Sequence, residues 1–279
     1  MKTLALIVTL VPAAHCFQSE DEQIISRTLH FSAEAQPRSL LVDNSNGSIS
    51  VSAHDGDAVE FIVHRRTQFK SPDHLQEANE DVQLEIRERR NRIEAVVDAP
   101  WRNRWKGDGF YGYTYDGYEV KFDFTIKVPR NVNLFLRTVN DGDIEVQGVE
   151  GEFELNNVNG SIIADRIAGS GRFIAVNGSL RIGFEKNPDG ECLFRTINGK
   201  IEATFRESLS ADLLLKTFNG NAYTDFDVVS LPALPPVVKS GKGRMAYKAG
   251  DFTSVRAGKG GPRLGFDTLN GCIYILKHE

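Results

Sequence analysis

The chain has 279 residues, of which 41% are hydrophobic and 25% charged, and its formal net charge is −5 at pH 7. A chain of this length forms one large domain or about two ordinary ones, and its apolar content can fill a core. Charges of both signs are mixed without a long run of either, which argues against the basic surface that nucleic-acid binding needs. We therefore expect a globular protein without nucleic-acid partners.

The segment 1–16 has the composition of a secretory signal peptide. A lysine precedes an apolar run over 4–11, and two alanines follow at 13–14. The run is too short for a membrane-spanning helix, which needs about 20 residues. We expect export to the periplasm, the outer surface or the extracellular space, and no transmembrane helix in the mature chain. His15 occupies a position where a lipidation motif requires a small residue, which argues against a lipid anchor at Cys16.

Two cysteines, Cys192 and Cys272, remain beyond this segment. In an exported chain, two cysteines can form a disulfide. Cys272 directly follows an Asn-Gly pair, whereas Cys192 precedes one, so their positions do not require proximity. The sequence leaves open whether they pair.

The segment 28–130 is predicted to form an N-terminal β region, because alternating apolar and polar residues recur between short turns. It contains the one helix that we predict, over 72–80. Ser71 is a favourable N-cap for this helix, and Pro72 suits its first turn.

The segment 99–118 differs in composition from the rest of the chain. It holds both tryptophans and four of the seven tyrosines, interleaved with glycines and charged residues. This pattern fits no buried strand and predicts a long loop, and long loops are often functional. Exposed aromatic rings can bind sugars or partner side chains, so the predicted ligand-binding residues are Trp101, Trp105, Tyr111, Tyr113, Tyr115 and Tyr118. The alternative is that these rings fold back as a lid over apolar strands.

A short phrase that ends in Asn-Gly recurs through 131–228, which we interpret as a repeat core. Its glycines follow one another in steps of 18, 18, 21 and 21 residues. Asn and Gly tolerate positive φ, so the phrase predicts tight turns between extended segments. The predicted turn residues, with a late copy near the C-terminus, are Asn140, Gly142, Asn159, Gly160, Asn177, Gly178, Asn198, Gly199, Asn219, Gly220, Asn270 and Gly271.

The step length predicts an all-β fold of stacked β-repeats, resembling a β-solenoid with roughly 18–21 residues per coil, plus one short helix in the N-terminal region. Equivalent positions would then lie about 4.8 Å apart. The asparagines would form one column with amide hydrogen bonds along it. A second, apolar column would lie beside it, formed by Val139, Val158, Val176, Ile197 and Phe218. The alternative is an antiparallel sandwich whose hairpins close at each Asn-Gly.

The segment 229–279 is predicted to be a proline-rich connector followed by a C-terminal repeat that acts as a cap. Its prolines cannot join the interior of a sheet, and a single repeat returns at 264–276. Repeat arrays need atypical ends that prevent edge-to-edge growth. We therefore interpret this tail and the N-terminal region as the two ends of the array.

The phrase Val120–Pro129, followed by 134–140 and serial Asn-Gly-x-Ile units, resembles the bacterial putative-adhesin family of exported domains of unknown function, also called toast-rack-like. The resemblance covers about 120–226, one unit at 264–276 and, more faintly, 40–66. It implies a β-solenoid-like, non-enzymatic protein of the bacterial cell envelope, and some relatives are associated with envelope-stress systems. The family has no catalytic residue to carry over, and the aromatic segment lies outside its common pattern.

Chemical motifs are missing from the sequence: it contains no nucleophile elbow, zinc-protease motif or phosphate loop. The acidic turns at 140–143 and 187–191 begin like calcium loops but complete none. We therefore predict no metal, no cofactor and no enzymatic activity.

The function predicted from these observations is that of an exported cell-envelope protein, a putative adhesin that binds an envelope protein or glycan through its surface. One alternative is an envelope-stress or regulatory accessory protein that binds a membrane partner. Another is a polysaccharide-active β-helix enzyme, although the outward repeat positions carry no acidic cluster. The sequence leaves the oligomeric state open.

Overall fold

The computed structural model describes the segments 19–32, 37–89, 91–100, 117–232, 237–241, 244–248 and 252–278. The predicted signal peptide lies outside them. Most described residues belong to β-strands, and the described part of the chain contains one helix, α1 (Pro72–Asp81). The fold is therefore all-β, as predicted. None of the described helical residues forms a segment long and apolar enough to span a membrane.

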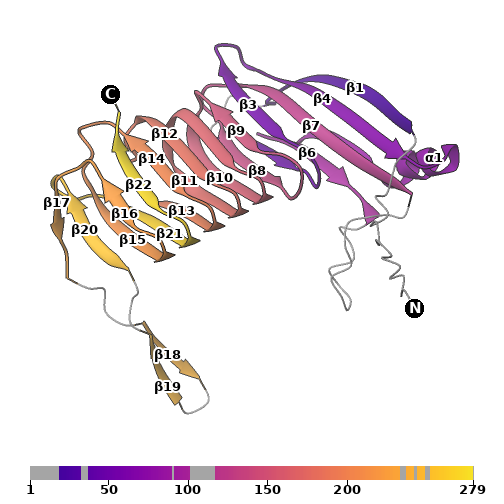
Figure 1. The fold of residues 1–279 in the computed structure, drawn as a ribbon. Helices are drawn as coiled ribbons and strands as arrows, with labels where there is room; N and C mark the ends of the chain where they lie inside the picture. Colours follow the sequence, from indigo (N-terminus) through magenta and orange to yellow (C-terminus); the bar gives the residue numbers. More distant parts are fainter. Residues whose placement is uncertain are drawn as a thin grey trace, which may run out of the picture.

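Twenty strands form one continuous sheet that folds into two facing layers (Figure 1). In spatial order, the first layer contains β5 (Gln83–Arg89), β6 (Arg92–Asp98), β2 (Ser39–Asp43), β8 (Asn133–Thr138), β10 (Glu150–Asn159), the second half of β11 (Ile162–Asn177), β13 (Cys192–Asn198), β21 (Arg263–Asn270), β15 (Ala211–Asn219), β20 (Thr253–Ala257) and β17 (Val228–Ser230).

The second layer begins at the same end of the molecule. Its strands, again in spatial order, are β1 (Ser19–His30), β4 (Ala58–Phe69), β7 (Tyr118–Pro129), β3 (Ile49–His54), β9 (Ile144–Gln147), the first half of β11, β12 (Leu180–Lys186), β14 (Ile201–Phe205), β22 (Ile273–Lys277) and β16 (Ala222–Thr224). A separate antiparallel hairpin is formed by β18 (Val237–Gly241) and β19 (Arg244–Lys248).

Strands from neighbouring repeats pair in parallel, not as hairpins. Asn159 pairs with Asn177, for example, and Ile162 pairs with Leu180. The strand β11 passes from one layer to the other, because its first half pairs with β9 and β12 and its second half with β10 and β13. The antiparallel sandwich, the alternative left open by the sequence, is therefore wrong for the repeat core.

The spatial order of the repeats departs from the sequence order at both ends. The pair β2 and β3 comes first in the sequence after β1, yet it lies between β6 and β7 on one side and β8 and β9 on the other. The last pair, β21 and β22, lies between β13 and β14 on one side and β15 and β16 on the other. The prediction that the C-terminal repeat is a terminal cap is therefore wrong, because that repeat is paired on both edges.

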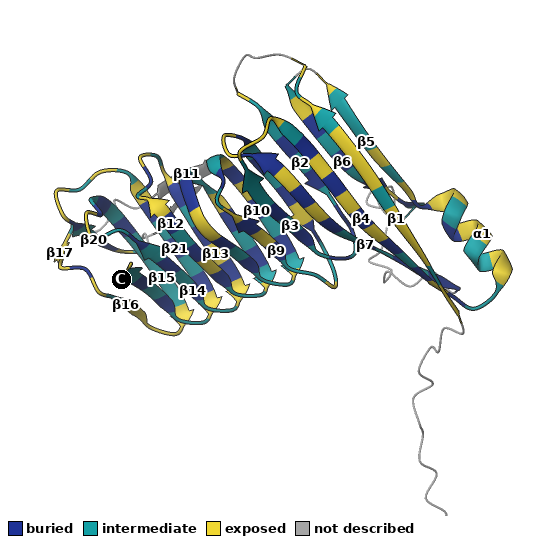
Figure 2. Cartoon of the chain, turned by 90° about the horizontal axis from the view of Figure 1, so that it is seen from above, coloured by how far each residue is buried: buried dark blue, intermediate teal, exposed yellow. Residues whose placement is uncertain are grey.

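The core lies between the two layers, and Figure 2 shows buried and exposed residues alternating along the strands. Aromatic rings form a column inside the first layer. Phe173 stacks on Phe153 with ring centroids 5.9 Å apart, and Phe194 stacks between Phe173 and Phe266 at 5.2 and 4.8 Å. Phe184 meets Phe194 edge-on from the other layer at 6.2 Å. Such pairs contribute about 0.5–1.5 kcal/mol each beyond the area they bury.

Three of the turn glycines are needed for close approach rather than for positive φ. Gly178, Gly199 and Gly271 are not among the glycines with positive φ. A Cβ on any of them would overlap the carbonyl oxygen of the turn glycine in the neighbouring repeat. Positive φ is therefore the wrong reason for glycine at these three turns.

The helix α1 begins where the sequence predicts it. The Ser71 side chain accepts a hydrogen bond from the backbone amide of His74, and Pro72 lies in the first turn. Ala78 is buried, and the helix packs on β4 and β7 at one end of the molecule (Figure 1). The strand β1 starts at Ser19, so the N-terminal β region begins earlier than the predicted residue 28.

Candidate binding surface along the Asn-Gly turns

The asparagines of the turns form a continuous ladder of side-chain hydrogen bonds. In each step, Nδ2 of one asparagine donates to Oδ1 of the previous one at 2.7–2.9 Å, in the order Asn140, Asn159, Asn177, Asn198, Asn270 and Asn219. The predicted amide column is confirmed, with one correction. Asn270 lies between Asn198 and Asn219, because the late repeat is inserted there.

A row of apolar side chains runs beside this ladder on the outer face of the first layer. We call it the apolar row; in spatial order it contains Val139, Val158, Val176, Ile197, Leu269 and Phe218. The three valines are partly buried. Ile197 is 42% exposed, Leu269 46% and Phe218 77%, so exposure increases toward the β15 end. The predicted apolar column is present, with Leu269 inserted before Phe218.

The residues that precede the apolar row point inward and fix the turns. Thr196 Oγ1 donates to the carbonyl of Gly178 at 2.7 Å, and Thr138 Oγ1 donates to the carbonyl of Gly47 at 2.8 Å. Asn157 makes the same kind of contact to Gly142 through Nδ2 at 3.0 Å. Thr217 and Thr268 make equivalent bonds to Gly271 and Gly199, so most of the backbone that carries the apolar row is firmly held.

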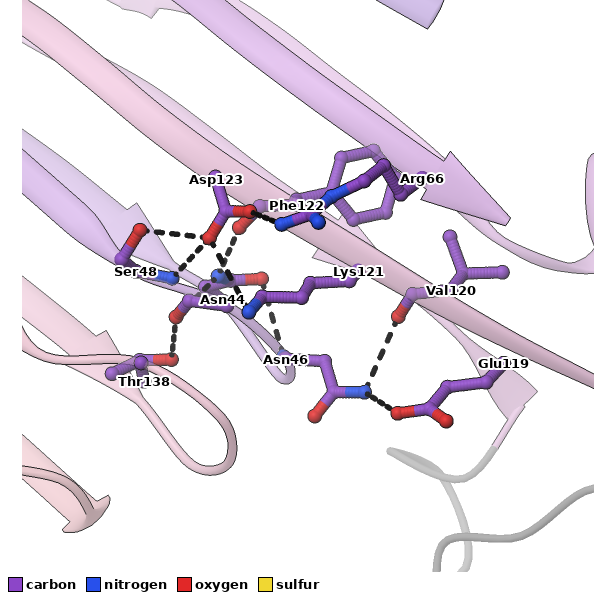
Figure 3. A network of polar contacts seen from close by, with 12 residues as sticks. Asn44, Asn46, Ser48, Arg66, Glu119, Val120, Lys121, Phe122, Asp123 and Thr138 are labelled. Atoms are coloured by element: carbon purple, nitrogen blue, oxygen red, sulfur yellow. Dashed lines mark hydrogen bonds and ion pairs between the residues drawn. The ribbon is translucent and has the colours of Figure 1, made fainter. Parts of the chain in front are cut away.

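At the N-terminal end of the turns, Asp123 collects several donors (Figure 3). Its Oδ1 accepts hydrogen bonds from the backbone amide and the hydroxyl of Ser48 at 2.9 and 2.7 Å, and its Oδ2 accepts one from Arg66 at 2.6 Å. Burial alone would raise the pKa of Asp123, but the bonds from Ser48 and Arg66 outweigh it and hold that pKa below its ordinary value. This carboxylate is committed to structure rather than available for catalysis.

The amide ladder ends beside this network. Asn46 forms a parallel bridge with Asn140, but its side chain turns away and donates to Glu119 Oε1 at 3.2 Å and to the carbonyl of Val120 at 3.4 Å (Figure 3). The regular column of amides therefore extends from Asn140 to Asn219.

The outer face of the second layer carries an aromatic pair close to the exposed end of the apolar row. The rings of Tyr223 and Tyr274 stack with centroids 5.3 Å apart, and Tyr223 is 49% exposed. Phe218 and Tyr223 flank the same Asn-Gly turn from the two layers. Apolar and aromatic surface is thus gathered around the last turn of the array.

The predicted aromatic site falls largely outside the described residues: this applies to Trp101, Trp105, Tyr111, Tyr113 and Tyr115. Tyr118 is described, and its predicted role in ligand binding is not supported. Its ring is buried at the start of β7, and its hydroxyl donates to Asp81 at 3.0 Å. The inward alternation of Tyr118 with Val120 and Phe122 was a signal of this burial that the composition of the segment concealed.

Cys192 and Cys272 are both free thiols, which settles the question that the sequence left open. Cys192 is buried in β13, and burial raises the pKa of its thiol to about 11. Cys272 lies partly exposed in a turn. Within the described segments, no group of three or more His, Cys, Asp or Glu residues is placed to hold a metal ion.

Comparisons with known proteins add little to this geometry. No family model matches the chain, and no curated protein matches it. The chain is similar to a solved structure described as a putative cell adhesion protein from Clostridium sporogenes ATCC 15579, with 11% identity over 93% of this chain and 100% of that one, and a TM-score of 0.39. A putative adhesin from Bacteroides fragilis NCTC 9343 has 11% identity over 92% and 97%, with a TM-score of 0.33. At these values neither likeness carries an argument about function.

Proposed function

We propose that this chain is an exported, non-catalytic binding protein with an adhesin-like role, and that it contacts a protein partner through the apolar row. In this proposal the two layers are the faces of a β-solenoid that serves as a rigid support. The observation that carries the proposal is the increase in exposure along the row, which ends at Phe218 with 77% of its surface exposed. Exposed apolar surface that is contiguous is more typical of an interaction site than of an inert face.

The chemistry of the row favours a protein over a glycan. Five of its six positions are aliphatic, and aliphatic side chains offer no ring face on which a sugar can stack. Burying apolar surface contributes roughly 25 cal/mol per Å², so several adjacent side chains together can support a stable contact. The firmly held turns favour binding further, since little backbone order must be gained on association.

The outer face of the second layer argues against a polysaccharide-active enzyme. Across its strands, one outward column reads Glu145, Ile163, Arg181, Glu202, Tyr274 and Tyr223. Its two carboxylates are three strand spacings apart, about 14 Å at the usual spacing, whereas glycosidases place theirs about 5–9.5 Å apart. Glu202 is also paired with Arg181 at 3.3 Å and Lys200 at 2.7 Å. The acid two residues before Glu145 is Asp143, and its Oδ1 accepts a hydrogen bond from the backbone amide of Ser161 at 2.7 Å.

The proposal is tested by affinity capture from envelope extracts with the exported protein as bait. The double substitution Phe218→Ser with Leu269→Ser removes the most exposed part of the row, and we expect it to abolish capture of any specific protein partner. Glu154→Gln on the outer face of the same layer is the control and should leave capture intact. The proposal would be rejected if the double variant and the control captured the same partner equally well. It would also be rejected if the protein bound a glycan and the double substitution left that binding unchanged.

A further inference from the structure

The N-terminal end of the molecule presents two strand edges that the rest of the described chain leaves unpaired. The strand β1 pairs only with β4, and β5 pairs only with β6. Both lie at the same end, one in each layer (Figure 2). β1 is 12 residues long, whereas β16 and β17 at the opposite end have 3 residues each. A long open edge is a template for pairing with another strand.

Between these two edges the core is open as a groove. One cavity of about 400 Å³ is lined by residues of both strands, among them Ile25, Leu84 and Ile86. A second cavity of about 310 Å³ shares Ile25 and Leu84 and reaches Val82 and Phe122. Because two residues line both cavities, the cavities form one continuous groove. Ile25, Leu84 and Ile86 remain only partly buried, so a further element that covered the groove would complete the core.

The outer face of β1 is also apolar at its centre. Ile24 is 67% exposed, and Ile62 on the neighbouring strand β4 is 44% exposed. Natural proteins commonly protect edge strands with charged residues or prolines at such positions. In β1 the charged residues lie toward the two ends of the strand, so the exposed Ile24 leaves the middle of the edge apolar.

The charges along β1 are complementary to those of a second, antiparallel β1. The first half of the strand carries Glu20, Asp21 and Glu22, and the second half carries Arg27 and His30. Antiparallel pairing about Ile24 places Asp21 opposite Arg27 of the other copy on the groove side. Within the described part of one copy, Arg27 forms no ion pair and donates only to the carbonyl of Ser26. Asp21 accepts a bond from Gln23 Nε2 at 3.0 Å, and its charge also acts on Arg65 of the neighbouring strand β4.

The second edge can pair with the same symmetry. Antiparallel pairing of two β5 strands about Ile86 places Glu85 opposite Arg87 of the other copy. Within one copy Arg87 already pairs with Glu85 at 2.7 Å and with Glu94 at 2.9 Å, so the charge argument rests on β1. Ile86 and Ile25 line the same cavity, so the centres of the two edges face each other across the groove. One two-fold axis can therefore pass through both centres, which is the requirement for a symmetric dimer.

The geometry points to a homodimer in which β1 pairs antiparallel with β1 of a second copy about Ile24, and in which the two copies close each other's groove. This contact is separate from the apolar row, so it stands whether or not the proposed function is correct. Each dimer would then carry two copies of the apolar row, and two linked binding sites bind more strongly to a surface that displays many copies of the partner.

Sedimentation equilibrium of the exported protein over a range of concentrations tests the dimer. We expect a reversible monomer–dimer equilibrium whose dissociation constant rises at least tenfold in Asp21→Arg and in Arg27→Asp. The double exchange should restore it to within about threefold of the wild-type value. Asp227→Arg, an exposed position at the opposite end, is the matched control and should leave the equilibrium unchanged. A protein that stays monomeric at about 100 μM, or a dimer that the double exchange fails to restore, would overturn the proposal.

A second measurement tests the register directly. In a Cys272→Ser background, Ile24→Cys places two thiols opposite each other at the two-fold axis, and we expect mild oxidation to give a covalent dimer. Glu22→Cys in the same background should give much less, because in this register it lies opposite Ser26. Equal cross-linking of the two variants would contradict the pairing, and circular dichroism spectra equal to wild type would show that the variants are folded.

Discussion

The side-chain amide of Asn219 donates a 2.7 Å hydrogen bond to Asn270, which follows it by 51 residues, and Asn270 in turn donates to Asn198, which precedes it by 72 residues. A repeat from the end of the chain is thus inserted into a ladder built by earlier repeats. The ladder is therefore sensitive to a change near the C-terminus, and this sensitivity can be measured.

Asn270→Ala should destabilise the protein by about 1–3 kcal/mol, because it removes two ladder bonds that each contribute about 0.5–1.5 kcal/mol. Asn140→Ala removes only one ladder bond, since Asn140 is the first member, and should have about half the effect. Urea denaturation of both variants measures the difference. Equal losses of stability would show that the ladder bonds are not the cause.

Gly178→Ala should cost about 1–3 kcal/mol or more, because its new Cβ overlaps the carbonyl of Gly160 and neither backbone can move away from its hydrogen-bonded neighbours. Gly265→Ala is the matched control in the same layer, where the new Cβ meets Leu193 Cδ1 at 3.4 Å, an ordinary contact distance. Thermal unfolding should separate the two variants. A loss in Gly265→Ala as large as in Gly178→Ala would contradict the role of close stacking.

Asp123 predicts a dependence of stability on pH. The pKa of Asp123 is lower in the folded chain than its ordinary value of 3.8. The ionised carboxylate therefore stabilises the folded state above about pH 4, and this stabilisation is lost as the pH falls through the folded pKa. The difference in unfolding free energy between wild type and Asp123→Asn should therefore be constant from pH 5 to 8 and shrink below about pH 4. Denaturant titrations at several pH values measure it. A difference that grows on acidification would reverse the assigned sign.

The two free thiols should react very differently. Burial of Cys192 and the rise of its pKa to about 11 leave almost no thiolate at pH 8, and the thiolate is the reactive form. We expect a chromogenic disulfide reagent to modify Cys272 quickly and Cys192 only after unfolding. Cys272→Ser should remove the fast phase. Fast modification of that variant at Cys192, located by peptide mass mapping, would contradict the buried position.

The two columns of side chains, amide and apolar, could be predicted from the sequence. The spatial order of the repeats that carry them could not. Alternation and the spacing of Asn-Gly identified the amide column, the apolar column and the turns, because each of these follows from local pattern. The position of Asn270 between Asn198 and Asn219 could not be predicted. All repeats have similar sequences, so any repeat could pair with any other, and no local pattern indicates which two repeats lie side by side.

Two errors have a different physical cause. The turn glycines were attributed to positive φ, whereas neighbouring backbones exclude a Cβ at positions such as Gly199, and a single repeat viewed alone does not contain that constraint. Tyr118 was grouped with an aromatic segment by composition, although its alternation with Val120 and Phe122 belongs to a buried strand. In both cases the deciding interaction is with a distant part of the chain.

The insertion of β21 and β22 also determines at what point during synthesis the sheet can finish folding. Among the residues that the structure describes, every strand that pairs with β15 or β16 lies after residue 252: these partners are β20, β21 and β22. The segment from Ala211 to Thr224 therefore lacks these sheet partners until residues beyond 252 have been made, and it gains the last of them with β22. A chain that leaves the ribosome, or crosses a membrane, from its N-terminus thus stays unfinished at one end until its last strand arrives, so a truncated product should be open to proteolysis there.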